Sequence, residues 1–181
     1  ISETYPSDLI GEYQIHNKKT VLQTITVLNS QKEFKITSEN TKSGLLNVVK
    51  NTGLQGRWQQ LNEFPKVICD TAHNKNGLEI VLNQIQKEDF DTLHIVLGVV
   101  NDKDLDEILP LFPKKAKYYF CKPNIPRGLN ADILHQKAKH FQLNGKVYNS
   151  VSNAYANATK NAVPNDFIYI GGSTFVVAEI L

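Results

Sequence analysis

The sequence predicts an α/β protein in which a Rossmann-like, mostly parallel sheet carries helices on both faces and follows a short helical segment. From Pro65 onward, apolar runs alternate five times with stretches of helical periodicity, and this alternation is typical of parallel sheets. The 181 residues are 41% hydrophobic and 21% charged, which is the balance of a globular domain with a packed core.

The first 64 residues follow a different pattern. A helix is expected over residues 13–30 and a second over about 39–51, ending near Gly53. Four apolar side chains share one face of the first helix: Ile15, Leu22, Ile25 and Leu28. The stretch 56–64 is then expected to be an extended strand.

Five pairs of a strand and a helical stretch make up the rest of the chain. The expected pairs are 66–70 with 76–87, 92–100 with 102–112, 117–121 with 130–141, 146–148 with 150–162, and 166–171 with 173–181. The crossovers are expected to be right-handed, and ligands of such sheets bind at the carboxyl ends of the strands. Asp70, Asp102 and Ser173 are expected at those ends.

Charge and composition exclude several classes of protein. The net charge is +2 without a basic block, so a nucleic-acid partner is not expected. The chain shows neither a membrane-length apolar run nor a signal-peptide pattern. Cys69 and Cys121 have no metal-site spacing, and we interpret them as buried, reduced thiols of a cytosolic protein, with a disulfide as the less favoured alternative. The chain has no Met and begins at Ile1, which fits a piece of a longer protein.

The stretch CDTAHNKNG (69–77) places polar residues in one strand-to-helix turn. A helix N-terminus attracts anions, and Asp70 at a strand tip can accept hydrogen bonds from ribose hydroxyls. The plainer interpretation is that Asn74 caps the helix and Asp70 is an ordinary turn residue. His73 alone would usually be a surface residue, and the five histidines form no metal-ligand spacing.

Two further turns carry candidate residues. In GRWQ, Arg57 offers a planar fork for phosphate, although it could simply pack on Trp58 at the surface. In GGST, Ser173 belongs to a small-ligand turn or is a plain helix cap. Neither GxGxxG nor GxxxxGK[ST] occurs, which argues against a plain NAD-dependent dehydrogenase and predicts that any phosphate loop lies elsewhere.

A family resemblance rests on six segments in order: GEYQIHNKKTVLQTITVL, GRWQQL, PKVICDTAHNKNG, HIVLGVVNDKD, PR and GGSTFVVAE. Together they resemble the C-terminal part of bifunctional folylpolyglutamate synthase/dihydrofolate synthase, in the Mur ligase superfamily, over essentially the whole chain. The resemblance implies that residues 1–50 are the tail of a central ATP-binding domain with its linker. Residues 51–181 would be the Mur ligase C-terminal Rossmann-like domain.

The resemblance also implies roles on the nucleotide side. Asn17 would contact adenine, with Gln14 as a weaker neighbour. Arg57 would reach the ATP phosphates as a catalytic residue, and Asp70 would hold the ribose. The Mg²⁺ ligands, the phosphate loop and the pterin pocket would lie upstream, so no metal ligand is expected in this chain.

On the glutamate side, the resemblance makes His73 a catalytic residue near the phosphates and the incoming amino acid, and Ser173 a glutamate-binding residue. Lys103, in NDKD, is expected either to shape the interdomain face or to be a solvated helix-start lysine. The chain departs from the family at Lys75, where a proline is usual, and around Arg127, where PRA or PRS becomes PRGLN. These departures leave the implied adenine and ribose contacts unchanged.

The implied activity is ATP-dependent ligation of L-glutamate to a folate or dihydropteroate carboxylate through an acyl phosphate. The protein would be a cytoplasmic monomer, and this chain alone would be inactive without its missing N-terminal and central domains. Two alternatives stay open, which are the C-terminal domain of a cell-wall Mur ligase and a non-catalytic Rossmann-like binding module.

Overall fold

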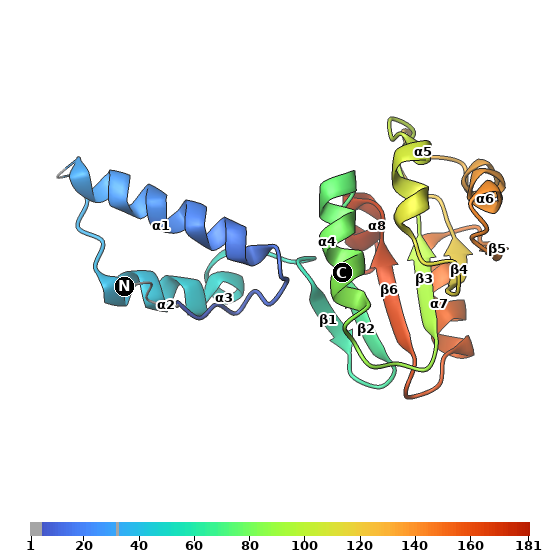
Figure 1. The fold of residues 1–181 in the computed structure, drawn as a ribbon, viewed down its shortest axis with the longest axis horizontal. Helices are drawn as coiled ribbons and strands as arrows, with labels where there is room; N and C mark the ends of the chain where they lie inside the picture. The colour runs from blue at the N-terminus through green and yellow to red at the C-terminus, as the bar shows by residue number, and fades with distance from the viewer. Residues whose placement is uncertain (1–4, 32) are drawn as a thin grey trace.

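The computed structural model describes residues 5–31 and 33–181, which form a helical segment beside a sheet domain (Figure 1). The helical segment holds α1 Gln14–Ser30, α2 Ser38–Leu46 and α3 Val48–Thr52. The strands of the sheet domain are β1 Gln59–Asn62, β2 Lys66–Cys69, β3 Leu93–Leu97, β4 Lys117–Phe120, β5 Gly145–Val147 and β6 Phe167–Gly171. Its helices are α4 Lys75–Ile85, α5 Leu105–Ile108, η1 Leu109–Leu111, α6 Ala131–His140, α7 Val151–Asn161 and α8 Thr174–Ala178.

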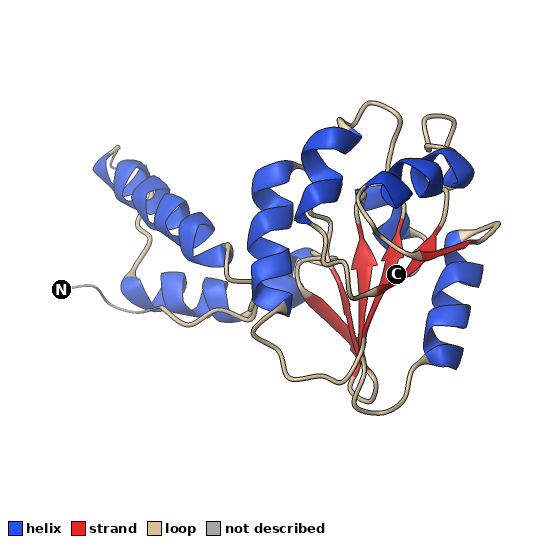
Figure 2. Ribbon diagram, turned by 45° about the vertical axis from the view of Figure 1, so that its right-hand side comes forward, coloured by secondary structure: helices blue, strands red, loops and turns tan. Residues whose placement is uncertain are grey.

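The sheet has the strand order β1-β2-β6-β3-β4-β5, and only β1 runs antiparallel to its neighbour. The predicted mostly parallel, Rossmann-like sheet is therefore confirmed, as are the five strand–helix pairs. Figure 2 shows helices on either side of the strands. Because β2 and β6 are parallel neighbours, their carboxyl ends meet, and the turns that follow Cys69 and Gly171 lie together.

Successive side chains along a strand point to opposite faces of the sheet, so each face packs into its own hydrophobic core. On β6, Phe167 and Tyr169 pack with α4, α5 and α6, whereas Ile168 and Ile170 pack with α7 and α8. Both cysteines are buried and free, which confirms the reduced-thiol interpretation. Burial raises the pKa of each thiol to about 12, so neither is a reactive thiolate.

Three sequence-based boundaries are wrong for identifiable reasons. The helix expected over 39–51 breaks at Asn47, and the Asp8 carboxylate accepts the Val49 N–H, so α3 starts afresh. The stretch 102–112 holds only the short α5 and a 3₁₀ turn, because Pro110 cannot continue a helix. The strand expected over 92–100 ends at Leu97, because the next residues turn to pair with the loop around Arg127.

The helical segment projects away from the sheet domain in both views (Figures 1 and 2). On α1, Leu22, Ile25 and Leu28 are half-buried, but the expected fourth member of that face, Ile15, is 55% exposed. Within the described ranges, no helix is long and apolar enough to cross a membrane.

Candidate functional site

The buried carboxylate of Asp70 organises the turn after β2. The residue is 1% exposed, and its backbone N–H bonds to the Ile170 carbonyl of β6. Three donors from separate segments bond to its side chain. The Tyr13 hydroxyl and the backbone N–H of Trp58 both donate to Oδ2 at 2.6 Å, and the backbone N–H of Ala72 donates to Oδ1 at 2.8 Å. Burial raises the pKa of Asp70, and these three hydrogen bonds offset part of that rise.

Arg57 reaches the same turn from the loop that precedes β1. Gly56 adopts φ +70°, and a Cβ there would come within 2.9 Å of Thr71 Cγ2 and Val177 Cγ1, so the loop needs a glycine. The Arg57 Nη1 donates to the Thr71 hydroxyl. The rest of its guanidinium fork is exposed, unlike the neighbouring Trp58, which is 2% exposed.

The predicted nucleotide residues line one cavity of about 290 Å³. Its walls are Tyr13, Asn17, Arg57, Asp70, Thr71, Ala72, His73, Asn74 and Gly77. The Asn17 amide donates to Gln14 Oε1 at 2.8 Å, which fixes the orientation of Asn17 at the start of α1. Residues that are far apart in sequence are thus brought together by the approach of α1 to the carboxyl end of β2.

His73 also borders a second cavity, of about 310 Å³, in which the predicted glutamate-side residues gather. The other walls are Val100, Asp102, Lys103, Arg127, Ser173, Thr174 and Phe175. His73 Nδ1 lies 3.0 Å from the Thr71 carbonyl, which can only accept, so Nδ1 carries the proton. A neutral His73 therefore keeps the lone pair of Nε2 for a ligand.

Cations and one carboxylate share this second cavity. The Asp102 carboxylate lies 3.8 Å from Lys103 Nζ and 3.9 Å from Arg127 Nη1. The Arg127 guanidinium covers the Phe175 ring at 4.8 Å from its centroid. Both ion pairs are long and partly exposed, so the two cations remain available to an anionic ligand.

Two of the plainer interpretations are correct for the backbone. The Asn74 side chain accepts from the Gly77 N–H at 2.9 Å and caps α4, and Ser173 Oγ accepts from the Phe175 N–H at 3.2 Å and caps α8. Ser173 is 2% exposed. Lys75, the departure from the family pattern, points to Glu107 at 3.9 Å.

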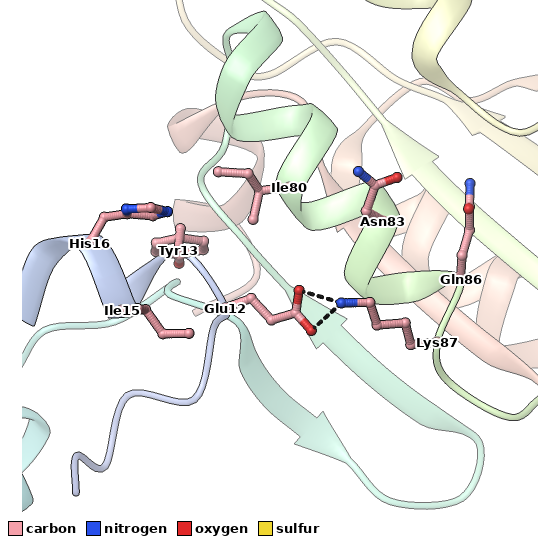
Figure 3. Close-up of a pocket in the computed structure, with 8 residues that line it drawn as sticks. All are labelled: Glu12, Tyr13, Ile15, His16, Ile80, Asn83, Gln86 and Lys87. Carbon is pink, nitrogen blue, oxygen red and sulfur yellow. Dashed lines mark hydrogen bonds and ion pairs between the residues drawn. The ribbon is translucent and has the colours of Figure 1, made fainter. Parts of the chain in front are cut away.

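A further cavity, of about 780 Å³, is an open groove between the start of α1 and α4 (Figure 3). The Glu12–Lys87 ion pair, at 2.7 Å, crosses it. Apart from Tyr13, it shares no residue with the two cavities above, and most of its other side chains are exposed. We place the candidate site in the smaller cavities because buried, oriented polar groups converge there.

Sequence reasoning did not single out several residues that line these cavities, among them Tyr13, Thr71 and Phe175. Tyr13 lies 57 residues from Asp70, so local patterning gives no sign of their hydrogen bond. In the part of the chain that the structure describes, no group of three His, Cys, Asp or Glu side chains could hold a metal ion.

Comparison with known proteins identifies close similarities. The family model for the Mur ligase glutamate ligase domain matches residues 56–174. A probable bifunctional folylpolyglutamate synthase/dihydropteroate synthase of Haloferax volcanii is 32% identical over 94% of this chain, and the chain spans 20% of that relative.

Solved structures agree with this result. E. coli FolC in complex with DHPP and ADP is 25% identical, with a TM-score of 0.82 over 98% of this chain and 40% of that one. The Yersinia pestis folylpolyglutamate synthase/dihydrofolate synthase with Mn, AMPPNP and L-glutamate bound is 25% identical, with a TM-score of 0.70 over 82% of this chain and 35% of that one. The chain thus spans well under half the length of these relatives. It belongs to the Mur ligase family, as a glutamate ligase domain.

Proposed function

We propose that this chain is the glutamate-side domain of an ATP-dependent ligase that joins L-glutamate to a folate or dihydropteroate carboxylate. One observation carries the proposal. Two cavities meet at His73, and one is lined by Asn17, Arg57 and Asp70, whereas the other is lined by the cations Lys103 and Arg127. An enzyme that activates one acid with a nucleotide and joins it to a dianionic amino acid needs both kinds of pocket side by side.

On the nucleotide side, the proposed roles follow from exposure and hydrogen bonding. Asn17 and the turn after β2 would contact the nucleoside, with one Asp70 oxygen accepting from a ribose hydroxyl. One N–H of the Arg57 guanidinium donates to the Thr71 hydroxyl, and the remaining N–H groups would donate to phosphate oxygens. As phosphoryl transfer develops charge on oxygens, a fixed guanidinium stabilises the transition state.

On the amino-acid side, Arg127 and Lys103 would bind the carboxylates of glutamate. Ser173 would bind a glutamate carboxylate through its O–H, because its oxygen accepts from the Phe175 N–H and the hydroxyl proton is left to donate. His73, between the two cavities, would contact the acyl phosphate or the incoming amine. The tetrahedral intermediate formed by amine attack carries a negative oxygen, which the Lys103 and Arg127 cations would stabilise.

ATP and a divalent ion are the proposed co-reactants, since the similar structures hold ADP, or AMPPNP with Mn. The described residues do not form a metal site, so the Mg²⁺ ligands are proposed to lie outside this chain. The ion, once bound there, would neutralise phosphate charge.

Residues 1–50 are proposed to belong to the neighbouring domain of the same protein; residues 1–4 lie outside the described ranges. Among the residues that the structure describes, seven of the twelve exposed large apolar side chains fall between residues 10 and 49. The sheet domain exposes few such side chains, so the segment is proposed to pack against further chain. We keep a monomer in the cytoplasm as the expected state.

The decisive experiment uses the full-length protein and measures ADP formation with L-glutamate and either dihydropteroate or tetrahydrofolate. Arg57→Ala and Asp70→Ala should each lower turnover at least tenfold, while Lys160→Ala, an exposed cation on α7, should not change it. Replacing glutamate by alanine or diaminopimelate tests the cell-wall alternative. A folded protein that forms no ADP with either pterin would refute the ligase assignment and favour a binding module.

A second arm tests the chain alone. The 181 residues should give no glutamate-dependent ADP formation under the same conditions, because the phosphate loop is absent from this sequence. Turnover by the chain alone would show that the proposed division of labour between domains is wrong.

A further inference from the structure

The helical segment meets the sheet domain through a few polar contacts around Glu12 and Tyr13. The Glu12 N–H donates to Gln84 Oε1 at 2.8 Å, and the Glu12 carboxylate pairs with Lys87. Figure 3 shows this pairing beside the Tyr13 ring. These Glu12 contacts involve the buried Gln84 of α4 and the exposed Lys87 just beyond it, and neither contact reaches the turn after β2.

Tyr13 alone among these contacts reaches the buried carboxylate. Its hydroxyl donates to Asp70 Oδ2 at 2.6 Å, although the residue itself is at the boundary of α1. Gly11 makes room for the ring, because a Cβ at Gly11 would lie 2.9 Å from the Tyr13 ring and 3.3 Å from Trp58 Cβ. The ring also packs against the core on the α4 face of the sheet.

The distribution of donors over the two Asp70 oxygens is unequal. Oδ2 receives two, from Tyr13 and from the Trp58 N–H, so both of its lone pairs are used. Oδ1 receives only the Ala72 N–H and keeps one lone pair. Asp70 can therefore offer a ligand one oxygen, provided that Oδ2 stays anchored.

We infer that Tyr13 is a positioning residue: its hydroxyl holds Asp70 Oδ2 so that Oδ1 faces a sugar hydroxyl of the nucleotide. Because Tyr13 immediately precedes α1, the position of α1 is thereby coupled to the contact between Asp70 and the sugar. The inference rests on the proposed function, since it needs a nucleotide in the cavity beside Asp70. The inference gives Tyr13 no contact with the phosphates of the nucleotide. The effect of Tyr13 on nucleotide affinity must therefore depend on the sugar hydroxyls.

The test measures ADP and 2′,3′-dideoxy-ADP binding to the full-length protein by titration calorimetry, for the parent and for Tyr13→Phe. A hydrogen bond to a charged group is worth roughly tenfold or more in affinity, so Tyr13→Phe should weaken ADP about tenfold. The same variant should bind dideoxy-ADP as the parent does, because that ligand has no hydroxyl for Asp70. Tyr155→Phe, which removes a hydroxyl from α7, is the matched control and should bind both as the parent does.

A double-mutant cycle with Asp70→Asn gives the second readout. If Tyr13 acts through Asp70, its effect on ADP should shrink to about twofold or less in the Asn background. Equal weakening of ADP and dideoxy-ADP by Tyr13→Phe would reduce Tyr13 to a packing residue and overturn the inference. So would unchanged ADP binding by Tyr13→Phe. A parent protein that does not bind ADP would instead overturn the proposed function itself.

Discussion

Removal of the Asp70 carboxylate should destabilise the protein through the donors that it leaves behind. In Asp70→Ala, the Trp58 N–H loses its acceptor in a site that is 2% exposed, at a cost of about 1–3 kcal/mol. Tyr13 and Ala72 are only half-buried, so their donors can partly turn to water and cost about 0.5 kcal/mol each. The variant also avoids the cost of burying a carboxylate, which offsets part of these losses. The free energy of unfolding should therefore fall by about 2–3 kcal/mol.

The assay is urea unfolding of the 181-residue chain, followed by far-ultraviolet circular dichroism. For a chain of this size, the loss corresponds to a fall of roughly 4–12 °C in the melting temperature. Asp102→Ala is the control, because that carboxylate is 55% exposed and should change stability by less than about 0.5 kcal/mol. An Asp70→Ala chain within about 1 kcal/mol of the parent would refute the view that this carboxylate organises the turn.

The pH dependence supplies a second, independent check. The raised pKa of Asp70 means that the folded chain keeps this proton to a higher pH than the unfolded chain, whose value is near 3.8. The Asp70 contribution to stability therefore falls as pH rises from 3.8 through the folded pKa. Consequently the deficit of Asp70→Ala should be largest near pH 4 and smaller at pH 7. A deficit that grows toward pH 7 would contradict the direction of the shift.

Three further predictions concern stability. Gly56→Ala should lower the free energy of unfolding in urea by about 1–3 kcal/mol, because φ at this position is +70° and the new Cβ would lie 2.9 Å from Thr71 and Val177. Gly44→Ala is the matched control: there is open space at this position in α2, so the change should be neutral or stabilise the chain by up to about 1 kcal/mol. Tyr169→Phe should raise the melting temperature, because within the described residues its buried hydroxyl has no hydrogen-bond partner. His94 is buried and its pKa is lowered by burial, so stability should fall as pH drops below about 6.5, and His94→Gln should remove this part of the loss in acid titrations.

The fold was predictable because its signals are local and repeated. Each strand of the parallel sheet is a short apolar run, and each following helix has its own periodic face, so errors in one pair do not spread to the next. The boundaries failed where a distant group decides the structure. Asp8 restarts the helix at Val49, and the loop around Arg127 draws the chain away from β3.

The candidate site was predictable as a set of positions but not as a set of contacts. The carboxyl ends of β2 and β6 had to meet in a parallel sheet, which brings Asp70 and Ser173 to one edge. The sequence indicated helix capping as one of two roles for Ser173, but it contains no local sign that a tyrosine 57 residues away would donate to Asp70 Oδ2. Such assignments depend on side-chain geometry, which periodicity does not encode.

A buried acid in a turn does not by itself point to a ligand, and Asp70 illustrates the difficulty. Its three donors need acceptors on both carboxyl oxygens, and an asparagine amide would turn an N–H against the Ala72 or Trp58 backbone N–H. Packing and hydrogen bonding therefore explain why an aspartate stands there. Arg57 is the more discriminating residue: it is exposed between two buried neighbours, and the Thr71 hydroxyl accepts from only one of its donors. An exposed arginine that lines a cavity beside a capped helix start is the stronger sign that an anion binds at this edge of the sheet.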